Sequence, residues 1–139
     1  VGKMILGSFV EDYFEEIKRL AREKPISFIE AEREVLGIDH AELGGRIMEQ
    51  WGFPGTIVSA VRFHHTPFLT PEDRESVDLI YLCDVVAMIT GIGGGADGLS
   101  YHAYGEVMRQ SNLKEKDVER FIVRLDDRFK GVEEMLKMA

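Results

Sequence analysis

The apolar residues of this chain recur at the spacing of an amphipathic α-helix along almost its whole length. Between residues 9 and 20 they share one helical face, at Val10, Tyr13, Phe14, Ile17 and Leu20. No stretch longer than a few residues alternates in the manner of a β-strand, and neither an internal repeat nor a linker between domains is visible. The periodicity therefore predicts a single all-α domain.

Helix-capping signals divide this pattern into separate helices. Ser27 and Glu30 have the spacing of a capping box, and Gly37 can end the helix that they start. Asp39 and Glu42 repeat that spacing and start the next helix. These signals predict two short consecutive helices in the first half of the chain.

The middle of the chain predicts two further helices. Pro54 suits the first turn of one, and Pro67 stops it. Its apolar face holds Ile57, Val58 and Val61. Thr70 and Pro71 start the other helix, which becomes a mostly apolar run over residues 79–89. A helix that is apolar nearly all round predicts the central buried helix of the fold.

A glycine-rich connector over residues 91–98 precedes the last part of the chain, where a helix is predicted around residues 101–109. Asn112 and Glu115 have capping-box spacing and predict a long C-terminal helix over residues 112–139. Its apolar residues step by 4, 3, 4, 3 and 4: Val118, Ile122, Leu125, Phe129, Val132 and Leu136. This heptad-like spacing leaves two alternatives, packing on the helix's own bundle or pairing with a partner helix or a second copy.

The composition limits the classes of partner. The 139 residues include 25 acidic and 17 basic side chains, a net charge of −8. Nucleic-acid and anionic-membrane surfaces are bound by clustered Lys and Arg, so neither partner is expected, whereas a small phosphorylated ligand held through a metal is compatible with this charge. The single cysteine, Cys83, allows no internal disulfide and is expected to be a small buried apolar residue. With no apolar run near 20 residues and no signal peptide, the chain is predicted to be cytoplasmic.

Asp84 is the first candidate for chemistry, because it interrupts the apolar run over residues 79–89. A carboxylate on a buried helix is costly unless a cation, a metal or several donors satisfy it. The alternative is a structural aspartate that caps a neighbouring helix or pairs with an arginine.

Histidines provide the second set of candidates. His64 and His65 end the helix before Pro67, where side chains can converge on the rim of a cavity. A lone histidine there is more often a packed core residue, whereas two adjacent imidazoles can serve one or two metal ions. His40 follows Asp39 in the first turn of its helix, where polar residues are usually solvated. His102 lacks such neighbours and is expected at the surface.

Together, His40, His64, His65 and Asp84 form a histidine–carboxylate set on three successive helices. Nitrogen and oxygen ligands of this kind suit a divalent metal such as Mn, Fe, Ni, Zn or Mg, and a site built from thiolates is excluded by the single cysteine.

Four motifs in a fixed order resemble the HD superfamily of helical metal-dependent phosphohydrolases, and most closely its HDOD branch, the HD-related output domain of bacterial signalling proteins. The motifs are EVLGIDHAELGG at residues 34–45, WGFP at 51–54, HHTP at 64–67 and CD at 83–84. The resemblance implies an HD-like helical bundle, with His40, His64, His65 and Asp84 in the positions of metal ligands. It also places Gly2 and Lys3 at the end of the motif His-Asp-x-Gly-Lys, which implies a phosphate-binding role for Lys3.

The chain departs from that family pattern in two places. The His-Asp doublet of the motif would lie immediately before Val1, so we expect residues 1–139 to be the C-terminal part of a larger HDOD-like domain, without its N-terminal helices. The Gly-Tyr-Pro motif of cyclic-dinucleotide phosphodiesterases is absent after His65, which argues against that activity.

These features lead to two main hypotheses. The first is a bacterial signal-transduction output domain with a degenerate HD site, which acts through partner domains or through self-association of its last helix. The second is a metal-dependent phosphohydrolase of nucleotides or phosphodiesters, in which the metal activates a water molecule. A di-iron oxygenase is a third reading of the resemblance, but no residue favours it separately. The sequence alone leaves open whether the chain is an enzyme.

Overall fold

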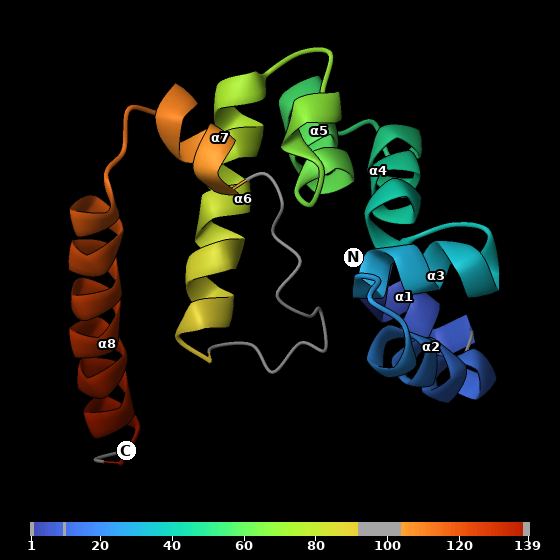
Figure 1. Ribbon diagram of the computed structural model, residues 1–139, viewed down its shortest axis with the longest axis horizontal. Coiled ribbons are helices and arrows are strands. Elements are labelled where there is room, and N and C mark those ends of the chain that lie inside the picture. Colours follow the sequence, from blue (N-terminus) through green and yellow to red (C-terminus); the bar gives the residue numbers. More distant parts are fainter. Residues whose placement is uncertain (1, 10, 92–103, 138–139) are drawn as a thin grey trace.

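The computed structural model of the chain describes residues 2–9, 11–91 and 104–137. Within these residues every regular element is a helix and no strand occurs, which confirms the all-α prediction. The elements are α1 (Gly2–Phe9), α2 (Glu11–Glu23), α3 (Phe28–Leu36), α4 (His40–Gln50), α5 (Gly55–Phe63), the 3-10 helix η1 (Pro67–Leu69), α6 (Arg74–Ile89), α7 (Tyr104–Gln110) and α8 (Glu115–Lys137). In the described part, no helix combines the length and apolar character needed to cross a membrane. Figure 1 shows α1 to α4 at one end, α7 and α8 at the other, and α5 and α6 between them.

The first helices differ from the predicted single helix over residues 9–20. Phe9 ends α1, a helix that the sequence pattern did not predict, and α2 begins only at Glu11. Tyr13 and Phe14 are exposed, and the buried residues of α2 and α3 form one cluster: Ile17, Leu20, Phe28 and Ala31. The periodicity therefore identified the helix correctly but placed its start too early.

The predicted ends of α3 are confirmed. The Ser27 hydroxyl accepts a hydrogen bond from the backbone N–H of Glu30, and the Glu30 carboxylate accepts one from the backbone N–H of Ser27. Gly37 ends the helix with a φ of 73°, a left-handed conformation that glycine adopts without steric cost. This turn directs the chain back into α4.

Glycines allow α4 to approach its two neighbours closely. A Cβ atom on Gly2 would lie 1.8 Å from the carbonyl oxygen of His40, so a larger residue cannot fit where α1 meets the start of α4. On α4, a Cβ atom on Gly45 would lie 2.7 Å from Cβ of Arg62 in α5. These contacts hold the first turn of α4 against α1 and the body of α4 against α5.

The prediction that residues 79–89 form a central helix buried all round is wrong. One face of α6 is buried, with Val77, Tyr81, Leu82 and Val85 in the core, whereas Leu79 is 60% exposed and Cys83 is also exposed. The expectation that Cys83 is buried is therefore wrong as well. Apolar residues cover more of the surface of α6 than the neighbouring helices contact. Part of this apolar surface therefore borders a cavity.

The loop between α7 and α8 corrects the predicted start of the last helix. Asn112 has a φ of 52° and ends α7, where the backbone N–H of Leu113 donates to the carbonyl oxygen of Met108 at 2.9 Å. The cap of α8 is provided by the carboxylate of Asp117, which accepts from the backbone N–H of Lys114 at 3.0 Å. Asn112 therefore lies outside α8, as a left-handed residue suits the end of a helix better than its start. Tyr101 and His102, for which we predicted a helix start and a surface position, lie outside the described residues, as does the glycine-rich connector from residue 92 on.

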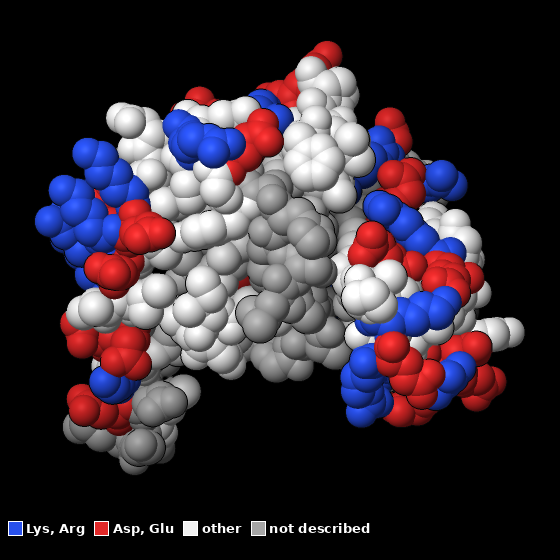
Figure 2. All heavy atoms as spheres, viewed as in Figure 1, with Lys and Arg blue, Asp and Glu red and all other residues white. Residues whose placement is uncertain are grey.

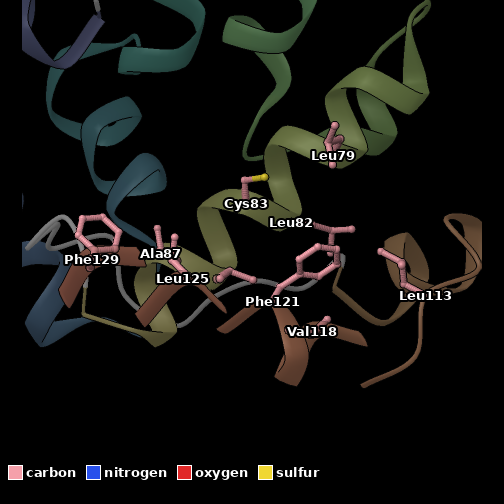
Figure 3. A pocket seen from close by; sticks show the side chains of 10 residues that line it. Leu79, Leu82, Cys83, Ala87, Leu113, Val118, Phe121, Leu125 and Phe129 are labelled. Atoms are coloured by element: carbon pink, nitrogen blue, oxygen red, sulfur yellow. The ribbon is translucent and has the colours of Figure 1, made fainter. Parts of the chain in front are cut away.

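The second hydrophobic core joins α6, α7 and the first turns of α8. Its buried residues are Tyr81, Leu82, Val85, Val107, Met108 and Val118. Beyond this core, an apolar cavity of about 400 Å³ lies between α6 and α8. Figure 3 shows Leu79, Leu82, Cys83 and Ala87 on α6 and Phe121, Leu125 and Phe129 on α8 around it. The first part of α8 thus packs on its own bundle, as one of the two predicted alternatives requires.

Candidate functional site: a histidine triad

Three of the predicted ligand residues meet at the junction of α4 and α5. His40 is the first residue of α4, His64 caps the end of α5, and His65 follows it directly. One ring nitrogen from each histidine lies within 4.8 Å of the other two. The Nε2 atoms of His40 and His65 are 3.0 Å apart. The structure therefore brings His40 together with the adjacent pair His64 and His65, from which it is distant in sequence.

Asp39 fixes the start of α4 and with it the place of His40. Its buried carboxylate accepts from the backbone N–H of Glu42 at 2.8 Å and from Nε of Arg33 at 2.5 Å. The predicted capping box is only half formed, because the Glu42 carboxylate binds Arg46 and Arg62 instead of the backbone of Asp39. His40 itself is buried, although first-turn polar residues are usually solvated.

Glu32 is a site residue that the sequence pattern did not single out. This buried carboxylate on α3 places Oε2 2.6 Å from Nδ1 and 2.9 Å from the backbone nitrogen of His40. A signal for it exists in the sequence, since Phe28, Ala31, Glu32 and Val35 share the i, i+3, i+4, i+7 positions of one helical face. A glutamate on an otherwise apolar face needs a buried partner, and His40 supplies two donors.

Burial keeps two of the histidines neutral. Desolvation is the main cause that lowers the pKa of His64, although its Nδ1–H donates to the carbonyl oxygen of Val61 at 2.7 Å, which acts in the opposite direction. Desolvation, with the neighbouring His64 and His40, lowers the pKa of His65 to about 2. Neutral imidazoles keep a lone pair on one ring nitrogen, which is the form that binds metals.

Asp84 lies beside the triad but outside its donor set. Its Oδ2 atom is 3.7 Å from Nδ1 of His65, and its side chain is 33% exposed. The expectation of a deeply buried carboxylate at this position is therefore wrong. The buried carboxylate of α6 belongs to Asp78, which pairs with Nε of Arg74 at 2.7 Å, the structural role that was the alternative for Asp84.

A cavity of about 750 Å³ borders the histidines. Four of the five predicted site residues line it, namely Lys3, His40, His64 and Asp84. Two hydroxyl side chains, Thr56 and Ser76, and several apolar side chains of α5 and α6 complete the wall. Polar groups from α1, α4, α5 and α6 therefore converge on one space of the size that small-molecule sites have.

Charged side chains are mixed over the visible surface. Figure 2 shows acidic and basic residues interspersed at both ends of this face and along its top, with uncharged residues among them. Many of these charges form exposed pairs such as Arg19 with Glu23 and Arg46 with Glu42. Such pairs contribute little to stability. In the described part of the chain, the buried charged or polar residues are Glu32, Asp39, His40 and Asp78.

The donor set of the triad fits a divalent transition metal. Three imidazole nitrogens within 4.8 Å can hold one ion, and imidazole suits Zn, Cu, Fe and Ni better than Mg, which prefers oxygen ligands. His40 lies at the start of α4, whereas His64 and His65 lie at the end of α5. The ion would therefore link these two helix ends.

Comparison with known proteins gives one sequence match and one fold match. The family model for the HDOD domain matches residues 1–67, which confirms the resemblance drawn from the motifs. The fold is similar to a crystal structure from Marinobacter aquaeolei VT8 described as a "putative signal transduction protein", with a TM-score of 0.74 and 22% sequence identity. The similarity covers 99% of this chain but 30% of that one, and at this identity it shows a common fold. No curated protein matches the sequence.

Proposed function

We propose that the chain is a regulatory output domain of a bacterial signal-transduction protein, because residues 1–67 match the family model for the HDOD domain. The shared fold with the protein from Marinobacter aquaeolei supports this proposal. No described residue favours the phosphohydrolase alternative over a regulatory role.

We propose that the output is a contact made by α8 with a second copy of the chain. The observation that carries this is the fall in burial along the heptad-like stripe. Val118 is buried, but Phe129 is 43%, Val132 47% and Leu136 73% exposed. The stripe thus continues past the turns that its own bundle covers. Exposed apolar residues in a continuous helical row are typical of a surface that packs against another helix.

Sedimentation of variants tests this proposal. Replacing both Val132 and Leu136 with Glu removes two apolar contacts from each copy and places charges in the contact. Each apolar side chain contributes about 1.5–3 kcal/mol when buried, so self-association should weaken by at least about 100-fold. Ile122 and Leu125 are less suitable positions, because they are half-buried against their own bundle.

Val123→Glu is the matched control, since Val123 is 61% exposed on the same helix but does not belong to the stripe. This variant should sediment like the wild-type chain. A wild-type chain that stays monomeric at millimolar concentration would contradict self-association through α8, as would equal effects of the stripe and control variants.

We further propose that His40, His64 and His65 hold one divalent metal ion, with Asp84 at 3.7 Å from His65 as a supporting carboxylate. When bound, the ion would act as a cross-link between α4 and α5. A ligand that binds only the folded state stabilises it, by about 2.7 kcal/mol at a concentration 100 times its Kd. The role of Lys3 toward a phosphate stays a prediction, which its place in the wall of the same cavity supports.

Titration with zinc by calorimetry tests the metal site. The wild-type chain should bind one ion and unfold at a higher temperature in its presence. His65→Ala should abolish both effects, because it removes one of three ligands. Asp84→Ala should weaken binding less, because Asp84 lies outside the triad. Equal zinc binding by the wild type and His65→Ala would contradict the site.

A further inference from the structure

Glu32 makes its two short contacts with a single residue. Its side chain is 4% exposed, and Oε2 lies 2.6 Å from Nδ1 and 2.9 Å from the backbone nitrogen of His40. A buried carboxylate is costly unless donors satisfy it, and both of these donors belong to His40. The pair therefore ties α3 to the first residue of α4 at the edge of the triad.

This contact determines which ring nitrogen of His40 carries the proton. An ionised carboxylate can only accept hydrogen bonds, so the 2.6 Å contact requires a hydrogen on Nδ1 of His40. In the neutral ring, Nε2 then bears the lone pair. That nitrogen lies 3.0 Å from Nε2 of His65, so His65 must donate from Nε2 when no ion is bound.

We propose that Glu32 is a positioning residue, which holds His40 as the Nδ1–H tautomer and presents the Nε2 lone pair to the other histidines. His64 reaches the equivalent state by another route, because its Nδ1–H donates to the carbonyl oxygen of Val61. Carboxylates commonly orient metal-ligating histidines in this way. The consequence for metal binding rests on the proposed metal site, whereas the tautomer exists without any metal.

A purely structural role for Glu32 gives a different expectation. The backbone N–H of His40 is among the first of α4 and has no partner within the helix, so Glu32 also satisfies a helix terminus. If that were its whole role, replacing Glu32 would lower the stability and leave the imidazole tautomer of His40 unchanged. The tautomer of the His40 ring in a Glu32 variant therefore distinguishes the two roles.

Nitrogen NMR of the metal-free chain, labelled with ¹⁵N in its histidines, measures that state at pH 7.5. We expect His40 with its proton on Nδ1 and His65 with its proton on Nε2. Glu32→Gln should keep the His40 tautomer, because the amide oxygen still accepts from Nδ1–H. Glu32→Met should release it, so that His40 shows the mixture of tautomers typical of a free imidazole. Glu34→Met is the control, since Glu34 is exposed on the same helix and pairs with Lys24.

Two results would overturn the proposal: a proton on Nε2 of His40 in the wild-type chain, or an unchanged His40 tautomer in Glu32→Met. The wild-type spectrum decides the first even if Glu32→Met does not fold.

Zinc binding to the same variants separates this proposal from that of the metal site. If both are correct, Glu32→Met should bind zinc about 10- to 100-fold more weakly than the wild type, and Glu32→Gln and Glu34→Met should stay close to it. A wild-type chain that binds no zinc but shows the expected tautomers supports the role of Glu32 and contradicts the metal site. A chain that binds zinc equally well with Met at position 32 contradicts the role of Glu32 and leaves the metal site standing.

Discussion

At the scale of single residues, burial has a stronger effect on the histidines than the charges around them. Desolvation is the largest cause of the lowered pKa of both His64 and His65, and it acts on His65 even though the Asp84 carboxylate is 3.7 Å away. Asp84 is too exposed to offset that cost. His64 and His65 therefore have neutral rings at neutral pH, which favours ligand binding over ion pairing.

The lowered pKa values predict that acid destabilises the fold through these rings. In the unfolded chain, histidine has a pKa near 6.5, so below that pH the unfolded state binds protons that folded His64 and His65 do not. The free energy of unfolding should fall as pH decreases from about 6.5, by at most about 1.4 kcal/mol per pH unit for each ring. Urea unfolding between pH 7.5 and 5 measures this slope.

His65→Asn provides the comparison, because asparagine does not titrate. As the pH falls from 6.5 to 5, the difference in proton uptake on unfolding between the wild-type chain and His65→Asn should approach one proton, so the free energy of unfolding of the variant should depend less on pH. The carboxylates contribute equally to both proteins in this range. Identical slopes would show that folded His65 is protonated in this range and that burial does not keep its ring neutral.

Residue-level chemistry was only partly predictable from the sequence. His40, His64 and His65 were predicted as ligands from their residue type and helix positions, and again from the ordered motifs, and the structure brings all three together. Glu32 and Asp78 were missed, because each is a carboxylate whose importance depends on burial against another element. Asp84 was expected to be buried because its neighbours in sequence are apolar, but the face of α6 that carries it borders a cavity.

At the scale of helices, the contact of α1 with α4 depends on the absence of a side chain at Gly2. An alanine there would place Cβ 1.8 Å from the carbonyl oxygen of His40, and a backbone atom cannot move aside without shifting the start of α4. Overpacking of this kind costs about 1–3 kcal/mol, more than the roughly 1 kcal/mol that alanine gains over glycine in a helix. Gly2→Ala should therefore lower the stability and disturb the histidine triad.

Gly7→Ala is the matched control on the same helix, since a Cβ atom at Gly7 meets nothing within 4 Å. It should raise the free energy of unfolding by up to about 1 kcal/mol. Urea unfolding of both variants checks the pair of expectations. A Gly2→Ala variant as stable as Gly7→Ala would mean that α1 and α4 are not in close contact at Gly2.

The helices themselves were largely predictable, and their ends and faces less so. The capping box at Ser27 and the left-handed Gly37 are local features, so the sequence is sufficient for them. Asn112 was misplaced because its left-handed backbone ends α7, which spacing to Glu115 does not reveal. The exposure of Leu79 depends on how far α6 and α8 stand apart, and no local pattern contains that distance.

At the scale of the whole molecule, the chain has two hydrophobic clusters at opposite ends, with the histidine triad at the α4–α5 junction between them. One cluster joins α2 and α3, and the other joins α6, α7 and the start of α8. Figure 1 shows α8 extending beyond the end of α6. This arrangement places the histidine triad between the two clusters and an exposed apolar stripe at one end. That residues 1–139 are the C-terminal part of a larger domain stays a prediction.

We propose that α8 is the surface through which this domain contacts a second copy. Amide hydrogen exchange of the wild-type chain tests this role of α8 most directly. It is measured at one concentration well below the dissociation constant of self-association and at another well above it. We predict that residues 126–137 become more protected at the higher concentration, whereas α4 and α5 exchange equally at both. Equal exchange of residues 126–137 at the two concentrations, with protection gained elsewhere or nowhere, would contradict it.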